Sequence, residues 1–143
     1  MNKDLEQAKA LLENNEEYTC AACRAGESFA SEEHGVRPLM RWLNEGTDLS
    51  GASAADRIVG KAAAFLYVLL GVRTVYAPLM SVPARETLRA HGIEAIADTV
   101  VPAIRNRTDT GFCPMESAVE DISNPRVLKA ALERKISEMM AKK

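Results

Sequence analysis

The chain has little of several features that mark specialised classes of protein. Its 143 residues include 3 cysteines, 2 histidines and 5% aromatic residues, and the formal net charge is −2. Three cysteines cannot form a fully paired disulfide framework, and a chain of this length can bury a core without one. The low aromatic content and the slightly negative charge argue against nucleic acid as a partner, because that binding needs basic surface and stacking side chains.

No apolar run is long enough to cross a membrane. The best candidate, residues 58–70, is too short for a bilayer and contains Lys61. The N-terminal stretch has no apolar signal-peptide core. We therefore expect no membrane partner and a reducing, cytoplasmic setting. Without repeats or linkers, we expect a single domain over residues 1–143, with a core at about 17–122 and a C-terminal helix at about 125–140.

Hydrophobic periodicity predicts helices that alternate with a few strands. The strongest element is a largely buried helix over residues 53–70, in which Ser53 and Asp56 resemble a capping box and Gly71 ends the helix. In chain order we expect a helix at 3–13, a hairpin of strands at 18–24 and 27–31, helices at 39–44 and 53–70, a strand at 72–79, a helix capped by Ser81 through 90, a strand at 93–101, and helices at 113–121 and 126–140. This order predicts an α/β/α sandwich on a mixed sheet, with parallel neighbours in its second half.

Four motifs carry a resemblance to a known family. They are G-V-R-P-L from Gly35, A-D-R-I-V-G-K-A-A-A from Ala55, V-Y-A-P-L-M-S from Val75 and N-R-T-D-T-G-F-C-P-M-E from Asn106, and together they span roughly residues 18–132. In order and spacing they resemble the uncharacterised DUF1893 family. The resemblance implies a cytidine-deaminase-like, three-layer α/β/α sandwich. Because one fold hosts many activities, the function must be argued from the site.

The residues that a zinc nucleobase deaminase needs are missing. Such enzymes place a His or Cys and a Glu at the start of the first core helix, and P-C-x-x-C at the start of the next. The expected helix starts read S-A-A-D-R-I-V-G from Ser53 and S-V-P-A-R-E from Ser81, and neither contains His or Cys. We therefore expect no zinc-dependent deamination, no metal and no cofactor.

Cys20 and Cys23 have a spacing that also occurs in metal-binding turns. They lie inside a predicted strand, where residues i and i+3 point to opposite faces. His34, His91 and Cys113 are distant in sequence and show no ligand spacing. We interpret Cys20 and Cys23 as small, semi-buried strand residues.

The segment G-F-C-P-M-E from Gly111 is the strongest candidate for catalysis. Pro114 suits the first helical position, so Cys113 falls at the N-cap, where unpaired N–H groups and the helix dipole favour the thiolate. Glu116, at the third helical position, can carry protons or reach back to the cap. Two interpretations therefore stay open: a reactive thiol in a small pocket, and a capped helix start without chemistry.

The loop that precedes this segment reads R-N-R-T-D-T from Arg105. Arginine forks bind carboxylate and phosphate groups, and a helix N-terminus nearby also favours anions. Asn106, Arg107 and Asp109 are therefore candidate ligand-binding residues for a small anionic molecule, such as a nucleotide or a sugar phosphate. A solvated loop held by an Arg107–Asp109 ion pair explains the same residues.

Three further candidates belong to the predicted core helices. Asp56 falls near the ligand position of deaminases and is a candidate proton carrier, with Gly60 on the same helical face. Lys61 is the charged residue deepest in the helix at 53–70, where it could hold an anion. Ser81 could offer its hydroxyl to a pocket. A cap, an ion pair, close packing or a lysine that reaches the surface is the commoner explanation of such residues.

Two functions from different classes follow. The first is a small-molecule-binding protein or enzyme for an anionic, nucleotide-like ligand, in which Cys113 is the nucleophile, Glu116 and Asp56 move protons, and Arg107 and Lys61 hold the anion. The alternative is a non-catalytic sensor or protein-interaction module on a degenerate deaminase-like fold. The sequence does not decide whether the chain is an enzyme, nor whether its last helix docks on its own domain or on a second copy in a homo-oligomer.

Overall fold

One mixed sheet with helices on both faces forms the described part of the molecule. The computed structural model describes residues 3–33 and 36–102, together with the helical positions Ala130 and Arg134. In chain order the elements are α1 (Lys3–Asn14), β1 (Cys20–Arg24), β2 (Glu27–Ser31), α2 (Arg37–Glu45), β3 (Ser53–Asp56), β4 (Ile58–Val59), α3 (Lys61–Leu70), β5 (Thr74–Ser81), α4 (Val82–Ala90) and β6 (Glu94–Val101). The fold is therefore α/β, as predicted.

The sheet combines an antiparallel hairpin with a parallel half. β1 lies between β2 and β3 and is antiparallel to both, whereas β3, β4 and β6 all pair with β5 in parallel. β3 and β4 run along the same side of β5, because the pairs Ser53–Thr74 and Ile58–Leu79 share one register. The order across the sheet is β2, β1, β3, β5; β4 pairs with β5 on the same side as β3, and β6 pairs with β5 on the other side. The prediction of parallel neighbours in the second half is confirmed.

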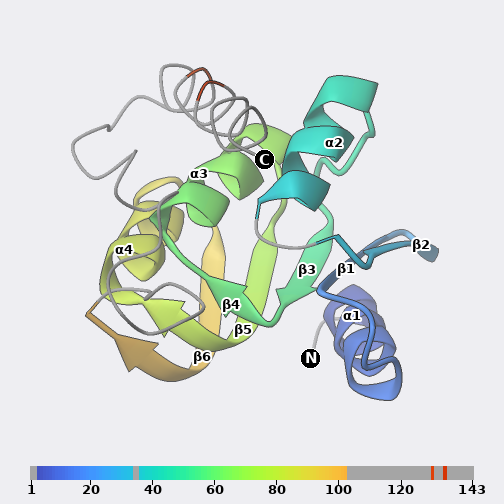
Figure 1. Cartoon of the computed structure of the whole chain (residues 1–143), viewed down its shortest axis with the longest axis horizontal. Helices are drawn as coiled ribbons and strands as arrows, with labels where there is room; N and C mark the ends of the chain where they lie inside the picture. Colours follow the sequence, from blue (N-terminus) through green and yellow to red (C-terminus); the bar gives the residue numbers. More distant parts are fainter. Residues whose placement is uncertain (1–2, 34–35, 103–129, 131–133, 135–143) are drawn as a thin grey trace, which may run out of the picture.

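The two faces of the sheet carry different helices (Figure 1). Among the described helices, α1 covers one face by itself and forms a small apolar cluster with β1, β3 and β5. The other face carries α2, α3 and α4 over a larger core. The fully buried side chains of that core include Leu39, Leu49, Leu66, Tyr67, Met80 and Leu88.

The helix predicted over residues 53–70 is wrong in its first half, which forms β3 and β4. Ala54 faces the larger core and Ala55 faces the small cluster under α1. Both faces of β3 are thus buried, and its alanine-rich sequence lacks the alternation that identifies a half-exposed strand. Ser53 lies inside β3, so the predicted capping box of Ser53 and Asp56 is also wrong.

The other predicted elements within the described residues are confirmed, with small shifts at their ends. Gly46 and Gly71 adopt the left-handed φ of 73° and 79° at the ends of α2 and α3, as their positions in the sequence predict. The helices predicted at 113–121 and 126–140 lie outside the described residues, apart from the two helical positions given above. In the part of the chain that the structure describes, no helix is long and apolar enough to span a bilayer.

Arg57 fastens α1 to the sheet. Its Nε donates to the carbonyl oxygen of Tyr18 at 2.8 Å, and its Nη2 donates to those of Leu12 at 2.9 Å and Asn15 at 3.1 Å. The last carbonyls of a helix have no partner within the helix, and α1 has no basic residue in its own last turn. Arg57, between β3 and β4, therefore supplies the C-terminal cation and donors that α1 lacks.

We expect Arg57→Ala to lower the free energy of unfolding by about 1–3 kcal/mol, because three carbonyl groups lose a charged donor. Urea denaturation measures the change. Arg73→Ala is the matched control, since Arg73 is also exposed and lies near the opposite end of the strands. Equal stability of the two variants would contradict the role of Arg57.

Candidate functional site

The first turns of two helices lie side by side where the parallel strands end. Val59 of β4 is paired with Met80 of β5, and the next residues along the chain, Gly60 and Ser81, are the N-caps of α3 and α4. Neighbouring strands are only about 4.8 Å apart, so the two helix N-termini are close neighbours. In open α/β sheets, the carboxyl ends of parallel strands are the usual place for a ligand.

The start of α3 combines two sources of positive potential. Gly60 caps the helix with extended backbone and without a side-chain hydrogen bond. Lys61 is the first helical residue and is partly exposed, and its ammonium lies 5.9 Å from the ring centroid of Phe65. The expectation that Lys61 lies deep in a long helix is therefore wrong. A lysine at this end adds to the positive end of the helix dipole rather than offsetting it, which favours an anion nearby.

Ser81 performs the capping role that its position in the sequence predicts. It is fully buried, and its Oγ accepts a hydrogen bond from the backbone N–H of Ala84 at 3.2 Å. Pro83 follows within the first turn, where a missing N–H costs nothing. The hydroxyl is thus engaged by its own helix.

Asp56 lies behind these helix starts, at the end of β3. The Tyr67 hydroxyl donates to its Oδ2 at 2.8 Å, and the backbone N–H of Ile58 reaches its Oδ1 at 3.4 Å. Cys20 is its direct partner across the β1–β3 ladder. Asp56 and Gly60 do not share a helical face, because Asp56 belongs to a strand and Gly60 is a helix cap.

Burial dominates the electrostatics of this cluster. It raises the pKa of Asp56 from 3.8 to about 7, against the lowering effect of the Tyr67 hydrogen bond. Burial, together with the neighbouring Asp56, also raises the pKa values of the Tyr67 hydroxyl and the Cys20 thiol. The Asp56 carboxyl, the Tyr67 hydroxyl and the Cys20 thiol are therefore neighbours in an environment that favours their neutral forms.

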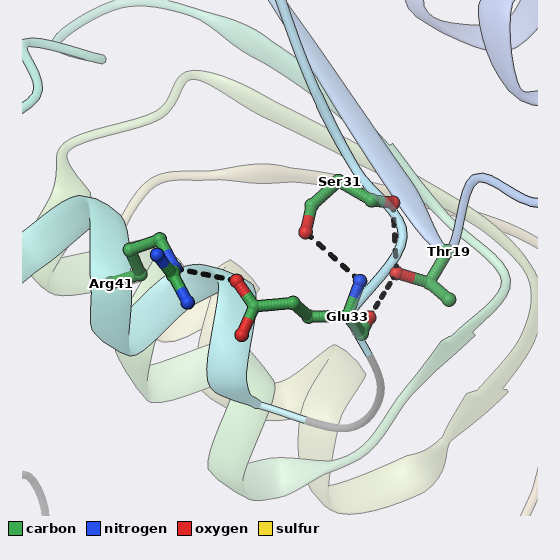
Figure 2. A network of polar contacts seen from close by, with 4 residues as sticks. All are labelled: Thr19, Ser31, Glu33 and Arg41. Atoms are coloured by element: carbon green, nitrogen blue, oxygen red, sulfur yellow. Dashed lines mark hydrogen bonds and ion pairs between the residues drawn. The ribbon is translucent and has the colours of Figure 1, made fainter.

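Figure 2 shows a network of polar side chains, which lies at the same end of the strands. The Thr19 hydroxyl bonds to the carbonyl oxygens of Ser31 and Glu33, and Ser31 Oγ accepts from the Glu33 N–H at 3.1 Å. The Glu33 carboxylate forms an ion pair with Arg41 of α2 at 2.5 Å. Because Cys20 is paired with both Ser31 and Asp56, this network and the Asp56 cluster lie at the same end of β1.

Cys20 and Cys23 face opposite sides of the sheet, as predicted. Cys20 belongs to the larger core and Cys23 to the cluster under α1, and both are free and buried. Among the described residues, no group of three or more His, Cys, Asp or Glu side chains could hold a metal ion.

The structure thus places Lys61 and Ser81 at adjacent helix starts and Asp56 deeper between α3 and the sheet. Asn106, Arg107, Asp109, Cys113 and Glu116 lie outside the described residues. Sequence reasoning missed Tyr67, Arg57 and the network of Figure 2. The prediction of one helix over residues 53–70 placed Tyr67 and Arg57 in the same element as Asp56, so their roles could not be inferred. Hydrogen bonds to backbone carbonyl oxygens cannot be predicted from the spacing of residues.

Removing the Ser81 hydroxyl tests whether it acts only as a cap. We expect Ser81→Ala to lower the free energy of unfolding by about 1 kcal/mol, the usual cost of a lost N-cap, as measured by urea denaturation. Unchanged stability, together with weaker binding of an anion, would instead assign the hydroxyl to a pocket.

Comparison with known proteins gives a family and a fold. The model of the family described as "Domain of unknown function (DUF1893)" matches residues 7–136. A crystal structure of a DUF1893 family protein from Thermotoga maritima has a TM-score of 0.85 and 22% sequence identity, and the match covers 94% of this chain and 91% of that chain. No curated protein matches the sequence. At this identity the likeness to the solved structure is one of fold.

Proposed function

Because the chain belongs to the DUF1893 family, which is described as a domain of unknown function, we propose a function from its own geometry. The protein binds a small anionic, nucleotide-like molecule at the edge where α3 and α4 begin. The observation that carries this proposal is the pairing of Val59 with Met80, which brings two helix N-termini together beside Lys61. Two dipole ends and an ammonium group attract a phosphate or carboxylate.

The path of the chain supports a contribution from the loop at residues 105–110. β6 runs parallel to β5, and its last residue, Val101, is paired with Ser81. The chain therefore leaves the sheet at the proposed site. Asn106 follows Val101 by five residues, a span of at most about 18 Å. In our proposal Asn106, Arg107 and Asp109 contact the ligand, with the Arg107 fork on its anionic group.

We also propose that the fold is of the cytidine-deaminase-like, three-layer type. Its support is the order of elements: a hairpin, then helices and parallel strands in alternation, with α1 on one face and α2, α3 and α4 on the other. Zinc chemistry is not part of the proposal. The residues that begin the two helices are Lys61-Ala62-Ala63 and Val82-Pro83-Ala84, and none of them is a zinc ligand.

An enzymatic form of this proposal assigns the chemistry to Cys113. Cys113 would be the nucleophile, Glu116 and Asp56 would move protons, and Arg107 and Lys61 would hold the anionic group. A non-catalytic sensor is the second candidate. The observations that favour it are the burial of Asp56 and its hydrogen bond to Tyr67, which keep this carboxyl away from solvent.

Ligand binding is tested by thermal unfolding of the protein with inorganic phosphate, a nucleoside monophosphate and a pentose phosphate. We expect at least one to raise the melting temperature, since a ligand that binds only the native state stabilises it by about 2.7 kcal/mol at a hundred times its Kd. Lys61→Ala and Arg107→Ala should weaken this effect, and Arg73→Ala should leave it unchanged. Equal stabilisation of all three variants would place the anion elsewhere.

The enzymatic form predicts a reactive thiol at Cys113. Iodoacetamide alkylation, followed by peptide mass spectrometry across pH, should give a midpoint well below the value of about 8.5 for a free thiol. Cys20 and Cys23 are internal controls and should react slowly, because burial raises the pKa of both. An ordinary midpoint or slow reaction at Cys113 would remove the nucleophile and leave the sensor.

A further inference from the structure

Asp56 and Arg57, adjacent at the end of β3, hold different helices. Asp56 accepts the Tyr67 hydroxyl of α3 on one face of the sheet. Arg57 donates to carbonyl oxygens at the end of α1 on the other face. Because these partners lie on opposite faces of the sheet, the Arg57 guanidinium is turned away from the Asp56 carboxyl. The cation next in sequence is therefore engaged elsewhere.

The groups that face Asp56 from its neighbours are mostly neutral. α3 contributes the Tyr67 hydroxyl, β1 contributes the Cys20 thiol, and the backbone after β3 contributes the N–H groups of Arg57 and Ile58. The charge of Arg57 acts on the carboxyl only as its weakest influence. Glu33 is the next carboxylate, and it acts on Cys20. Within the described residues, no lysine or histidine is among the groups that act on Asp56.

A buried carboxylate without a counter-ion is costly, whereas the neutral acid is not. The Tyr67 hydroxyl can donate to the carboxyl oxygen in either state, so it does not replace the missing cation. Loss of the proton to solvent therefore places a charge between β3 and α3 that the described residues compensate only in part. Water entry or displacement of α3 would relieve that charge.

We propose that Asp56 is a proton-operated latch between the sheet and α3. With its proton, the neutral carboxyl stays buried beneath α3, in contact with the Tyr67 hydroxyl. Without it, α3 loosens from the sheet, and the helix start at Lys61 loosens with it. This inference does not depend on ligand binding, although the latch lies directly behind the proposed anion site.

The direction of the pH effect follows from the raised pKa. A group whose pKa is higher in the folded protein stabilises it fully below the unfolded pKa, and this stabilisation is lost as pH rises through the folded pKa. For Asp56 the loss extends from pH 3.8 to about 7. Up to about a thousand-fold change in the unfolding equilibrium corresponds to three pKa units. The loss is complete just above neutral pH, so α3 should open most readily there.

The experiment is amide hydrogen exchange of α3 in the full chain from pH 5.5 to 8.5, corrected for intrinsic exchange rates. In the wild type we expect protection of α3 to fall from pH 5.5 to about 7 and to level off above it, and in Asp56→Asn we expect protection that does not change with pH. Asp98→Asn is the matched control: Asp98 is exposed and accepts the Tyr76 hydroxyl at 2.6 Å. It should retain the wild-type profile.

A second measurement covers the case in which Asp56→Asn does not fold. Carbon NMR titration of the Asp56 carboxyl in the wild type should give a midpoint near 7, and Tyr67→Phe should move it upward, because the hydroxyl favours the ionised form. A midpoint near 4, or equal pH dependence of α3 in wild type and Asp56→Asn, would overturn the latch. Failure to bind any anion would overturn only the proposed function.

Discussion

The attachment of both helical layers to the end of β3 is the constraint on which the rest of the structure depends. Asp56 holds α3 and Arg57 holds α1, through side chains that leave adjacent backbone positions in opposite directions. Alanines supply part of the apolar contacts between the layers, beside larger side chains such as Leu66 and Met80. Apolar contacts are non-directional, so the directional bonds at the end of β3 help to fix where the helices sit.

Much of the fold could be predicted from the sequence, because most of its elements obey a local rule. Gly46 and Gly71 end their helices where periodicity stops, and Ser81 caps α4. The failure at β3 has a physical cause. Ala54 and Ala55 are buried on both faces, and a short run of small apolar residues fits a helix and a central strand equally. Only pairing with β1 and β5, which is non-local, decides between them.

The candidate site was predictable only where it depends on helix termini. Lys61 and Ser81 were found as single residues, but their proximity follows from the β4–β5 register, which residue spacing does not encode. The partners of Asp56 were missed for the same reason, since Tyr67 and Cys20 come from different elements. The solved DUF1893 structure shares the fold at 22% identity. The arrangement of layers therefore tolerates extensive change of sequence, and a fold of this kind says little about chemistry.

The single register along β3, β4 and β5 has a consequence for how the chain can vary in length. β4 continues the line of β3 along β5 with only Arg57 between them. Inserting or deleting one residue within β3 would move its side chains to the opposite face of the sheet. Asp56 would then face α1 and lose its contact with Tyr67 of α3. The hairpin turn at Ala25-Gly26 carries no such restriction, because its residues are exposed. Natural length variation should therefore concentrate in turns of that kind and avoid the short segment from Ser53 to Gly60.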